Sequence, residues 1–174
     1  MMKKTMITLV LALMATVAMQ AQSLEGKWIA AEETDDVNMA YILVFEGNLM
    51  RQCGLFETEA AEMGDVTISI VVPAQSFTPG SKTLNFTFDA KEAELDVQDI
   101  DFNDKLKATV KDSPEKKEAL TNIILALFRE QKEEMAENML LKGPHTIVKL
   151  TDEQLVLRDE EGEEYVFGRN LPEE

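Results

Sequence analysis

The chain has 174 residues, of which 33 are acidic and 17 basic, and its formal net charge is −16. Such an excess of negative charge repels phosphate backbones, which excludes nucleic acid as a partner. Cys53 is the one cysteine, so no intramolecular disulfide can form, and its apolar neighbours favour a buried position.

The first 21 residues have the pattern of a secretory signal peptide. Lys3 and Lys4 precede an apolar run over residues 6–19, which is too short to span a bilayer stably. We expect cleavage after residues 1–21, which takes the net charge from −16 to −18 because two lysines are lost. The mature chain, residues 22–174, is then expected to form one periplasmic or secreted domain with no transmembrane segment.

Strict alternation of apolar and other residues dominates the rest of the chain. A period of two with one apolar face is typical of half-buried antiparallel strands. Short, regularly spaced strands favour a closed barrel, so we predict a mainly β fold, a closed antiparallel up-and-down barrel of eight or nine strands. The predicted strands cover residues 26–31, 40–46, 49–57, 66–73, 82–89, 92–102, 146–150, 154–159 and 163–169.

Turn signals separate these runs. Glu46-Gly47-Asn48 links two strands of a hairpin, Thr78-Pro79-Gly80 fits a type II turn, and Gly162 can supply a residue with positive φ for a short hairpin loop. After Val97 the parity of the apolar positions changes, which predicts a β-bulge or bend near Gln98-Asp99.

One segment has helical periodicity instead. Ser113-Pro114-Glu115 is a helix start, and Gly143-Pro144 ends the run. We predict one long amphipathic helix over residues 114–142, or two shorter helices with a break near Gln131. Its apolar stripe is expected to pack on the barrel; a movable lid and a surface for a protein partner are the alternatives.

The two ends of the mature chain carry a paired signal. Gly26-Lys27-Trp28 lies on the first predicted strand, and Arg169 follows Tyr165-Val166-Phe167-Gly168 on the last one. With the export signal and the alternation, these residues resemble the lipocalin-like domains of exported proteins from Bacteroidetes-type bacteria. The resemblance implies that the first and last strands pair and that Arg169 covers Trp28, so that Gly26, Trp28 and Arg169 close the barrel.

Two features depart from the lipocalins proper. Those proteins carry a Thr-Asp motif between two late strands, whereas Thr151-Asp152 here lies in a simple hairpin turn. They also place their helix after the last barrel strand, whereas residues 114–142 precede the final strands. Both departures weaken the transfer of the family's ligand class to this chain, and they leave the prediction of a barrel standing because it rests on the alternation.

Catalysis, cofactors and metals have little support in the sequence. His145 is the one histidine and has no accompanying nucleophile motif, so we predict no enzyme activity and no catalytic residues. Asp99, Asp101 and Asn103 have the spacing of a calcium loop, but Asp104 and Val110 stand where such a loop needs glycine and glutamate. We therefore predict no cofactor and no metal site.

The barrel interior carries the leading functional hypothesis. Parity places a set of aromatic side chains inside, where they either line a cavity for a small apolar or amphipathic molecule or pack as a filled core. The first case makes the chain a small-molecule binder. The second makes it a protein-interaction module that binds its partner through the 114–142 helix and the barrel rim. The candidate cavity residues are Phe45, Phe86, Phe88, Tyr165 and Phe167.

Overall fold

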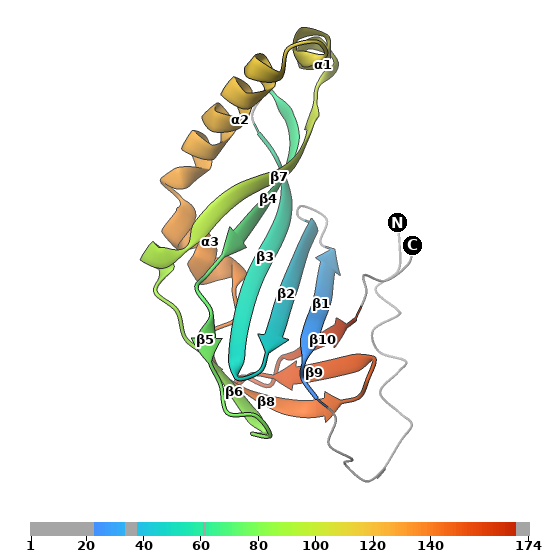
Figure 1. Cartoon of the computed structure of the whole chain (residues 1–174), viewed down its shortest axis with the longest axis vertical. Coiled ribbons are helices and arrows are strands. Elements are labelled where there is room, and N and C mark those ends of the chain that lie inside the picture. Colours follow the sequence, from blue (N-terminus) through green and yellow to red (C-terminus); the bar gives the residue numbers. More distant parts are fainter. Residues whose placement is uncertain (1–22, 34–37, 61, 170–174) are drawn as a thin grey trace.

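The computed structural model describes residues 23–33, 38–60 and 62–169; the predicted signal peptide lies outside them. One strongly curled antiparallel sheet forms most of this part, in the order β6-β8-β9-β10-β1-β2-β3-β4-β7, with β5 paired to β3 (Figure 1). The strands are β1 (Gly26–Glu33), β2 (Asn38–Glu46), β3 (Leu49–Glu59), β4 (Gly64–Val71), β5 (Gln75–Ser76), β6 (Thr83–Phe86), β7 (Glu94–Phe102), β8 (Gly143–Leu150), β9 (Gln154–Arg158) and β10 (Glu164–Gly168).

The predicted alternation sets the two faces of the sheet. Trp28 pairs with Leu43, and Leu43 pairs with Gln52, so all three side chains share one face across β1, β2 and β3. All three are buried on the concave side. In Figure 1 the last three strands, β8 to β10, run almost crosswise to β1–β3, which gives the sheet its strong curl.

The sheet does not close into the barrel that the sequence led us to expect. In the described part of the chain, β6 and β7 form its two edges and do not pair with each other. Two observations account for the open edge of β7. Helices pack beside it, where a closing strand would lie, and its exposed positions include Glu94, Asp96, Asp99 and Asp101, charges that disfavour pairing with another strand.

A side chain nevertheless bridges β5 and β6. The Gln75 amide nitrogen donates to the carbonyl of Asn85 at 2.5 Å, and its oxygen accepts from the backbone N–H of Thr87 at 2.8 Å. Because β5 is paired to β3, Gln75 links β3 to β6 much as a strand residue would. At this point β3 and β6 are therefore connected through β5 and the Gln75 amide group, and not through a ladder of backbone hydrogen bonds between paired strands.

The helical insertion consists of several short helices and not of one long helix. The elements are α1 (Asp104–Val110), α2 (Pro114–Arg129) and α3 (Lys132–Met139), with a short 3₁₀ turn, η1 (Ala90–Glu92), before β7. The break between α2 and α3 falls at Glu130-Gln131, as the second of the two predicted alternatives has it. Helix α1 was not predicted; Asn103 caps it by accepting from the backbone N–H of Leu106.

Two apolar clusters fill the concave side. The first lies toward the helices and contains residues of β3, β4 and β7 with Ile124, Met135 and Ala136. The second lies within the curl of β1–β3 and β8–β10 and includes Trp28 and Leu141. The buried Gln52 side chain marks the junction, since its amide pairs with both backbone groups of Leu141, at 3.1 and 3.0 Å. We call the first apolar cluster the helical cluster and the second the barrel cluster.

The predicted bulge is present in β7. Thr67 of β4 pairs with Asp99, but its neighbour Ile68 pairs with Val97, so Gln98 is the extra residue. The Gln98 amide donates to the Ser69 hydroxyl at 2.8 Å. The bulge brings Val97 and Ile100, which have opposite parity in the sequence, to the side of the helical cluster.

Candidate functional site

Trp28 and Arg169 lie together at one end of the barrel cluster. The guanidinium carbon of Arg169 stands 3.6 Å from the centre of the fully buried Trp28 ring, and the indole nitrogen donates to the Leu24 carbonyl at 2.7 Å. Arg169 also donates to the carbonyls of Glu25 at 2.8 Å and Asp152 at 3.2 Å. One side chain therefore joins the start of β1, the end of β10 and the β8–β9 turn.

Gly26 has a specific place in this arrangement. Its φ is +99°, and a Cβ at this position would stand 2.9 Å from a terminal nitrogen of Arg169. A larger residue would be strained in its backbone and would also push the guanidinium from its place. The Gly-x-Trp pattern and the late arginine thus belong to one structural unit.

The five aromatic residues expected to line a cavity lie in different places. Phe45, Phe86 and Phe167 are buried in the barrel cluster, each at 2% exposure or less. Phe45 packs edge-on against Phe77, with ring centres 5.2 Å apart. Tyr165 is half-buried at the margin of the same cluster, whereas Phe88 packs against the helical cluster.

A second aromatic group lies beside the barrel cluster and was not singled out from the sequence. The ring centre of Tyr165 is 6.0 Å from that of Tyr41 and 5.6 Å from that of His145, and His145 packs edge-on against Phe86 at 5.1 Å. His145 is buried, while both tyrosines are half-buried. Tyr41 shares the inward parity of Leu43 and Phe45, and that parity was the signal that could have identified it.

Burial and neighbouring negative charge act on Tyr165. Desolvation of the phenol is the larger cause, followed by the carboxylates of Glu163 and Asp159, and together they raise its pKa well above the ordinary value. The hydroxyl donates to Glu163 at 3.3 Å. Tyr165 is therefore a neutral hydrogen-bonding group throughout the physiological pH range and not a base.

The side chains of His145 and Cys53 pack within the protein. The His145 ring is buried between Phe86 and Tyr165, and its Nδ1 lies 3.3 Å from the Gly143 carbonyl. Cys53 is half-buried and not fully buried as its apolar neighbours predicted. This burial raises the pKa of its thiol, against a smaller opposing effect of Lys27, and so favours the protonated form.

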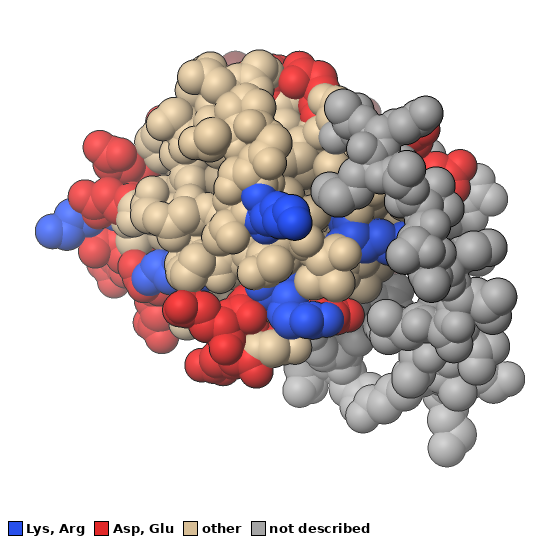
Figure 2. Space-filling model, turned by 90° about the horizontal axis from the view of Figure 1, so that it is seen from below, with Lys and Arg blue, Asp and Glu red and all other residues tan. Residues whose placement is uncertain are grey.

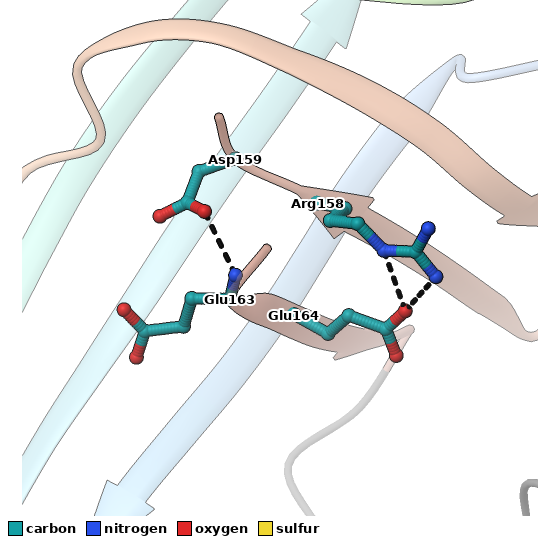
Figure 3. Close-up of polar contacts among 4 residues, drawn as sticks. All are labelled: Arg158, Asp159, Glu163 and Glu164. Carbon is teal, nitrogen blue, oxygen red and sulfur yellow. Dashed lines mark hydrogen bonds and ion pairs between the residues drawn. The ribbon is translucent and has the colours of Figure 1, made fainter. Parts of the chain in front are cut away.

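The carboxylates of Asp159 and Glu164 form contacts within the β9–β10 hairpin (Figure 3). The Asp159 carboxylate accepts from the backbone N–H groups of Glu161 at 3.0 Å and Glu163 at 2.8 Å. Arg158 and Glu164, which are register partners, form a cross-strand ion pair. These contacts fix the hairpin. No group of three or more potential metal ligands occurs among the residues that the structure describes.

Two of the three residues with the spacing of a calcium loop, Asp101 and Asn103, have partners of their own. Asp101 pairs with Lys107 at 2.7 Å, and Asn103 caps α1. The spacing that resembled a calcium loop is accounted for by a strand end followed by a helix N-terminus.

Two hollows lie on the described surface of the molecule. One, of about 360 Å³, lies along β8–β10 and is lined by residues that include Lys149, Gln154 and Val166. The other, of about 340 Å³, lies between β7 and the helices and is lined by residues that include Leu95 and Arg129. Both are open to solvent, so neither encloses a ligand as a lipocalin cavity would.

Charge is unevenly distributed over the molecule. Residues 71–88 and 138–151 contain no acidic residue, although acids make up almost a fifth of the chain; their charged residues are Lys82, Lys142 and Lys149. Seen from the end where β6 and β8 lie, Figure 2 shows a broad uncharged area with scattered Lys and Arg side chains and Asp and Glu gathered toward its margins. An acidic partner meets the least repulsion at this end.

Among the described residues, no helix combines the length and the hydropathy that crossing a membrane requires. No family model matches the chain, and no curated protein or solved structure is significantly similar to it.

Proposed function

We propose that the chain is an exported, lipocalin-like protein that acts as a protein-interaction module, with a filled core and without catalysis. The observation that carries this proposal is the packing of the interior. Phe45, Phe86 and Phe167 belong with Trp28 to one cluster of buried side chains, which supports a filled interior. Export is supported by the basic and apolar pattern of residues 1–21.

The surface supports the same proposal. Helix α2 exposes two large apolar side chains, Ile123 at 50% and Leu127 at 51%, on one side. Exposed apolar groups that lie next to each other on a helix are typical of a binding surface.

A site-specific cross-linking experiment tests this proposal. A photoreactive phenylalanine analogue replaces Leu127 on α2 or, as control, the similarly exposed Val148 on β8. After irradiation in the cells that produce the chain, we expect a discrete protein adduct from position 127 and none from position 148. Adducts to neither position, or the same adducts to both, would contradict a binding role of α2.

A second candidate function has its own observation. Tyr41 and Tyr165 place half-buried hydroxyl-bearing rings beside the barrel cluster, an arrangement suited to an amphipathic molecule held at the margin of the core. Replacement of either tyrosine by alanine should then weaken binding of such a molecule. A panel of amphiphiles that bind equally to both variants and to the unchanged protein would remove this candidate.

A further inference from the structure

On its exposed side, α2 carries two pairs of residues that lie equally far from Ile123, Ala119 with Leu127 and Lys116 with Glu130. Six of its residues, Lys116, Ala119, Ile123, Ala126, Leu127 and Glu130, the last being the C-terminal cap, are exposed to solvent. Successive residues of an α-helix are separated by about 100°, so all six lie within about 60° of the direction of Ile123. We call these six residues the α2 face. The adjacent Ile124 points instead into the helical cluster, where it is fully buried.

We propose that the α2 face binds the α2 face of a second copy of this chain, antiparallel and about a two-fold axis that passes beside Ile123. In this arrangement each position faces the one equally far from residue 123 on the other copy. Ile123 then meets Ile123, Ala119 meets Leu127, and Lys116 meets Glu130. A two-fold contact needs such a self-complementary surface, since both copies contribute the same residues.

The sizes of the side chains suit this register. Ala119 presents a small side chain where the partner presents Leu127, and the reverse holds on the other side of the axis. A large residue facing a small one lets two helices approach closely without a gap. Ile123, whose exposed fraction is 50%, would be removed from water in the contact.

The charges select the antiparallel orientation. A parallel pair would place Lys116 against Lys116 and Glu130 against Glu130, whereas the antiparallel pair joins opposite charges at both ends. Each residue is also at the helix end that the dipole disfavours, a cation in the first turn and an anion at the C-terminal cap. Neither takes part in the three ion pairs that the described residues form.

The expected affinity is modest. Helix α2 has 16 residues, which makes it about 24 Å long at about 1.5 Å per residue. A single helix pair of this length falls in the smallest class of specific interfaces, below about 1,200 Å². The charge of each copy also opposes association, and added salt screens that repulsion over about 8 Å at physiological ionic strength. We therefore expect a micromolar or weaker dimer.

This inference rests on the proposed function, because it takes α2 as the binding surface and names the partner. The two can fail separately. A cross-link from position 127 to a different protein would support the proposed function and overturn the dimer. An adduct of twice the mass of the mature chain would support both.

Sedimentation velocity tests the dimer directly, on residues 22–174 across a wide concentration range at physiological ionic strength. We expect the unchanged chain to shift reversibly from monomer to dimer. Ile123→Glu should abolish the shift because it places two carboxylates at the axis. The control, Val148→Glu, introduces the same charge at an exposed apolar position on β8 and should dimerise like the unchanged chain.

Charge exchange tests the register. Lys116→Glu and Glu130→Lys should each weaken the dimer several-fold, because each creates two like-charge contacts. The double variant should restore it, and an equimolar mixture of the two single variants should associate more strongly than either alone, because both crossed contacts then join opposite charges. A chain that remains monomeric, or a dimer that survives Ile123→Glu, would overturn the proposal, as would single variants that the double exchange fails to rescue.

Discussion

Replacement of Arg169 by alanine should destabilise the protein far more than replacement of an ordinary surface arginine. The change removes the guanidinium 3.6 Å from the Trp28 ring centre and its bonds to the carbonyls of Glu25 and Asp152. The stacking contributes about 0.5–2 kcal/mol. Arg169 is half-exposed, so water replaces much of the hydrogen bonding, and we expect a total loss of about 2–3 kcal/mol.

Urea unfolding followed by tryptophan fluorescence is a suitable assay, because Trp28 is the single tryptophan of the chain and reports from the site of the change. With a slope of about 2 kcal/mol/M, the expected loss moves the midpoint by about 1–1.5 M. Arg169→Lys keeps the charge but loses the planar stacking group, so it should recover less than half of the loss.

The matched control is Arg158→Ala. Arg158 is exposed and forms a cross-strand ion pair with Glu164, an interaction worth about 0.2–1 kcal/mol at a surface. If Arg169→Ala and Arg158→Ala lower the free energy of unfolding equally, the Arg169 side chain does not hold the first strand to the last one.

Three further changes test other parts of the structure. Phe86→Ala should lower the free energy of unfolding by about 3–5 kcal/mol, measured by urea titration, because it leaves a cavity in the barrel cluster; a loss of less than about 1 kcal/mol would mean that the interior is not packed. Gln75→Ala should speed hydrogen exchange at the Thr87 amide, measured by NMR, because the Gln75 oxygen is the acceptor for that N–H; unchanged exchange would refute the bridge. Tyr165 has a raised pKa in the folded state, caused first by burial and then by nearby carboxylates, so the unfolded chain ionises first. The stability that its neutral form contributes is present below about pH 10 and is lost as pH rises beyond that value. In thermal melts, Tyr165→Phe should make the melting temperature fall less steeply as the pH rises in this range. An unchanged pH dependence would contradict the raised pKa of Tyr165.

Local patterns in the sequence were sufficient for much of the fold. Strand positions follow from side-chain parity, and even the bulge at Gln98 could be predicted, because Val97 and Ile100 change parity across it. The stacking of Arg169 on Trp28 follows from the resemblance of the two chain ends to lipocalin-like domains, and the structure places the two side chains in contact.

Long-range pairing could not be read from the same patterns. The acidic positions of β7 fit an edge strand, but they also fit the solvent face of a paired strand, so parity alone does not tell which strand lies beside β7 in space. The bridge made by Gln75 is equally invisible, because a glutamine in a polar loop has no periodic signal. Helix α1 was missed because Asn103, which caps it, was considered only as the third position of the calcium-loop spacing that begins at Asp99.

The sequence also predicts which side chains point into the interior, but not whether they leave a cavity. Parity correctly places Phe45, Phe86 and Phe167 on the concave face. Whether inward rings leave a cavity depends on how tightly the sheet curls, which is set by contacts between residues distant in the sequence. Phe88 belongs to the helical cluster because β6 ends at Phe86 and the chain turns away beyond it.

Titration of the mature chain with a fluorescent long-chain fatty acid is the most direct test of the filled core, and Phe86→Ala serves as the comparison. The account predicts no saturable binding to the unchanged protein at micromolar concentrations, and a gain of binding by small apolar probes once Phe86 is truncated. One-to-one binding of the fatty acid to the unchanged protein, with a change in Trp28 fluorescence, would contradict it and identify the interior as a ligand site.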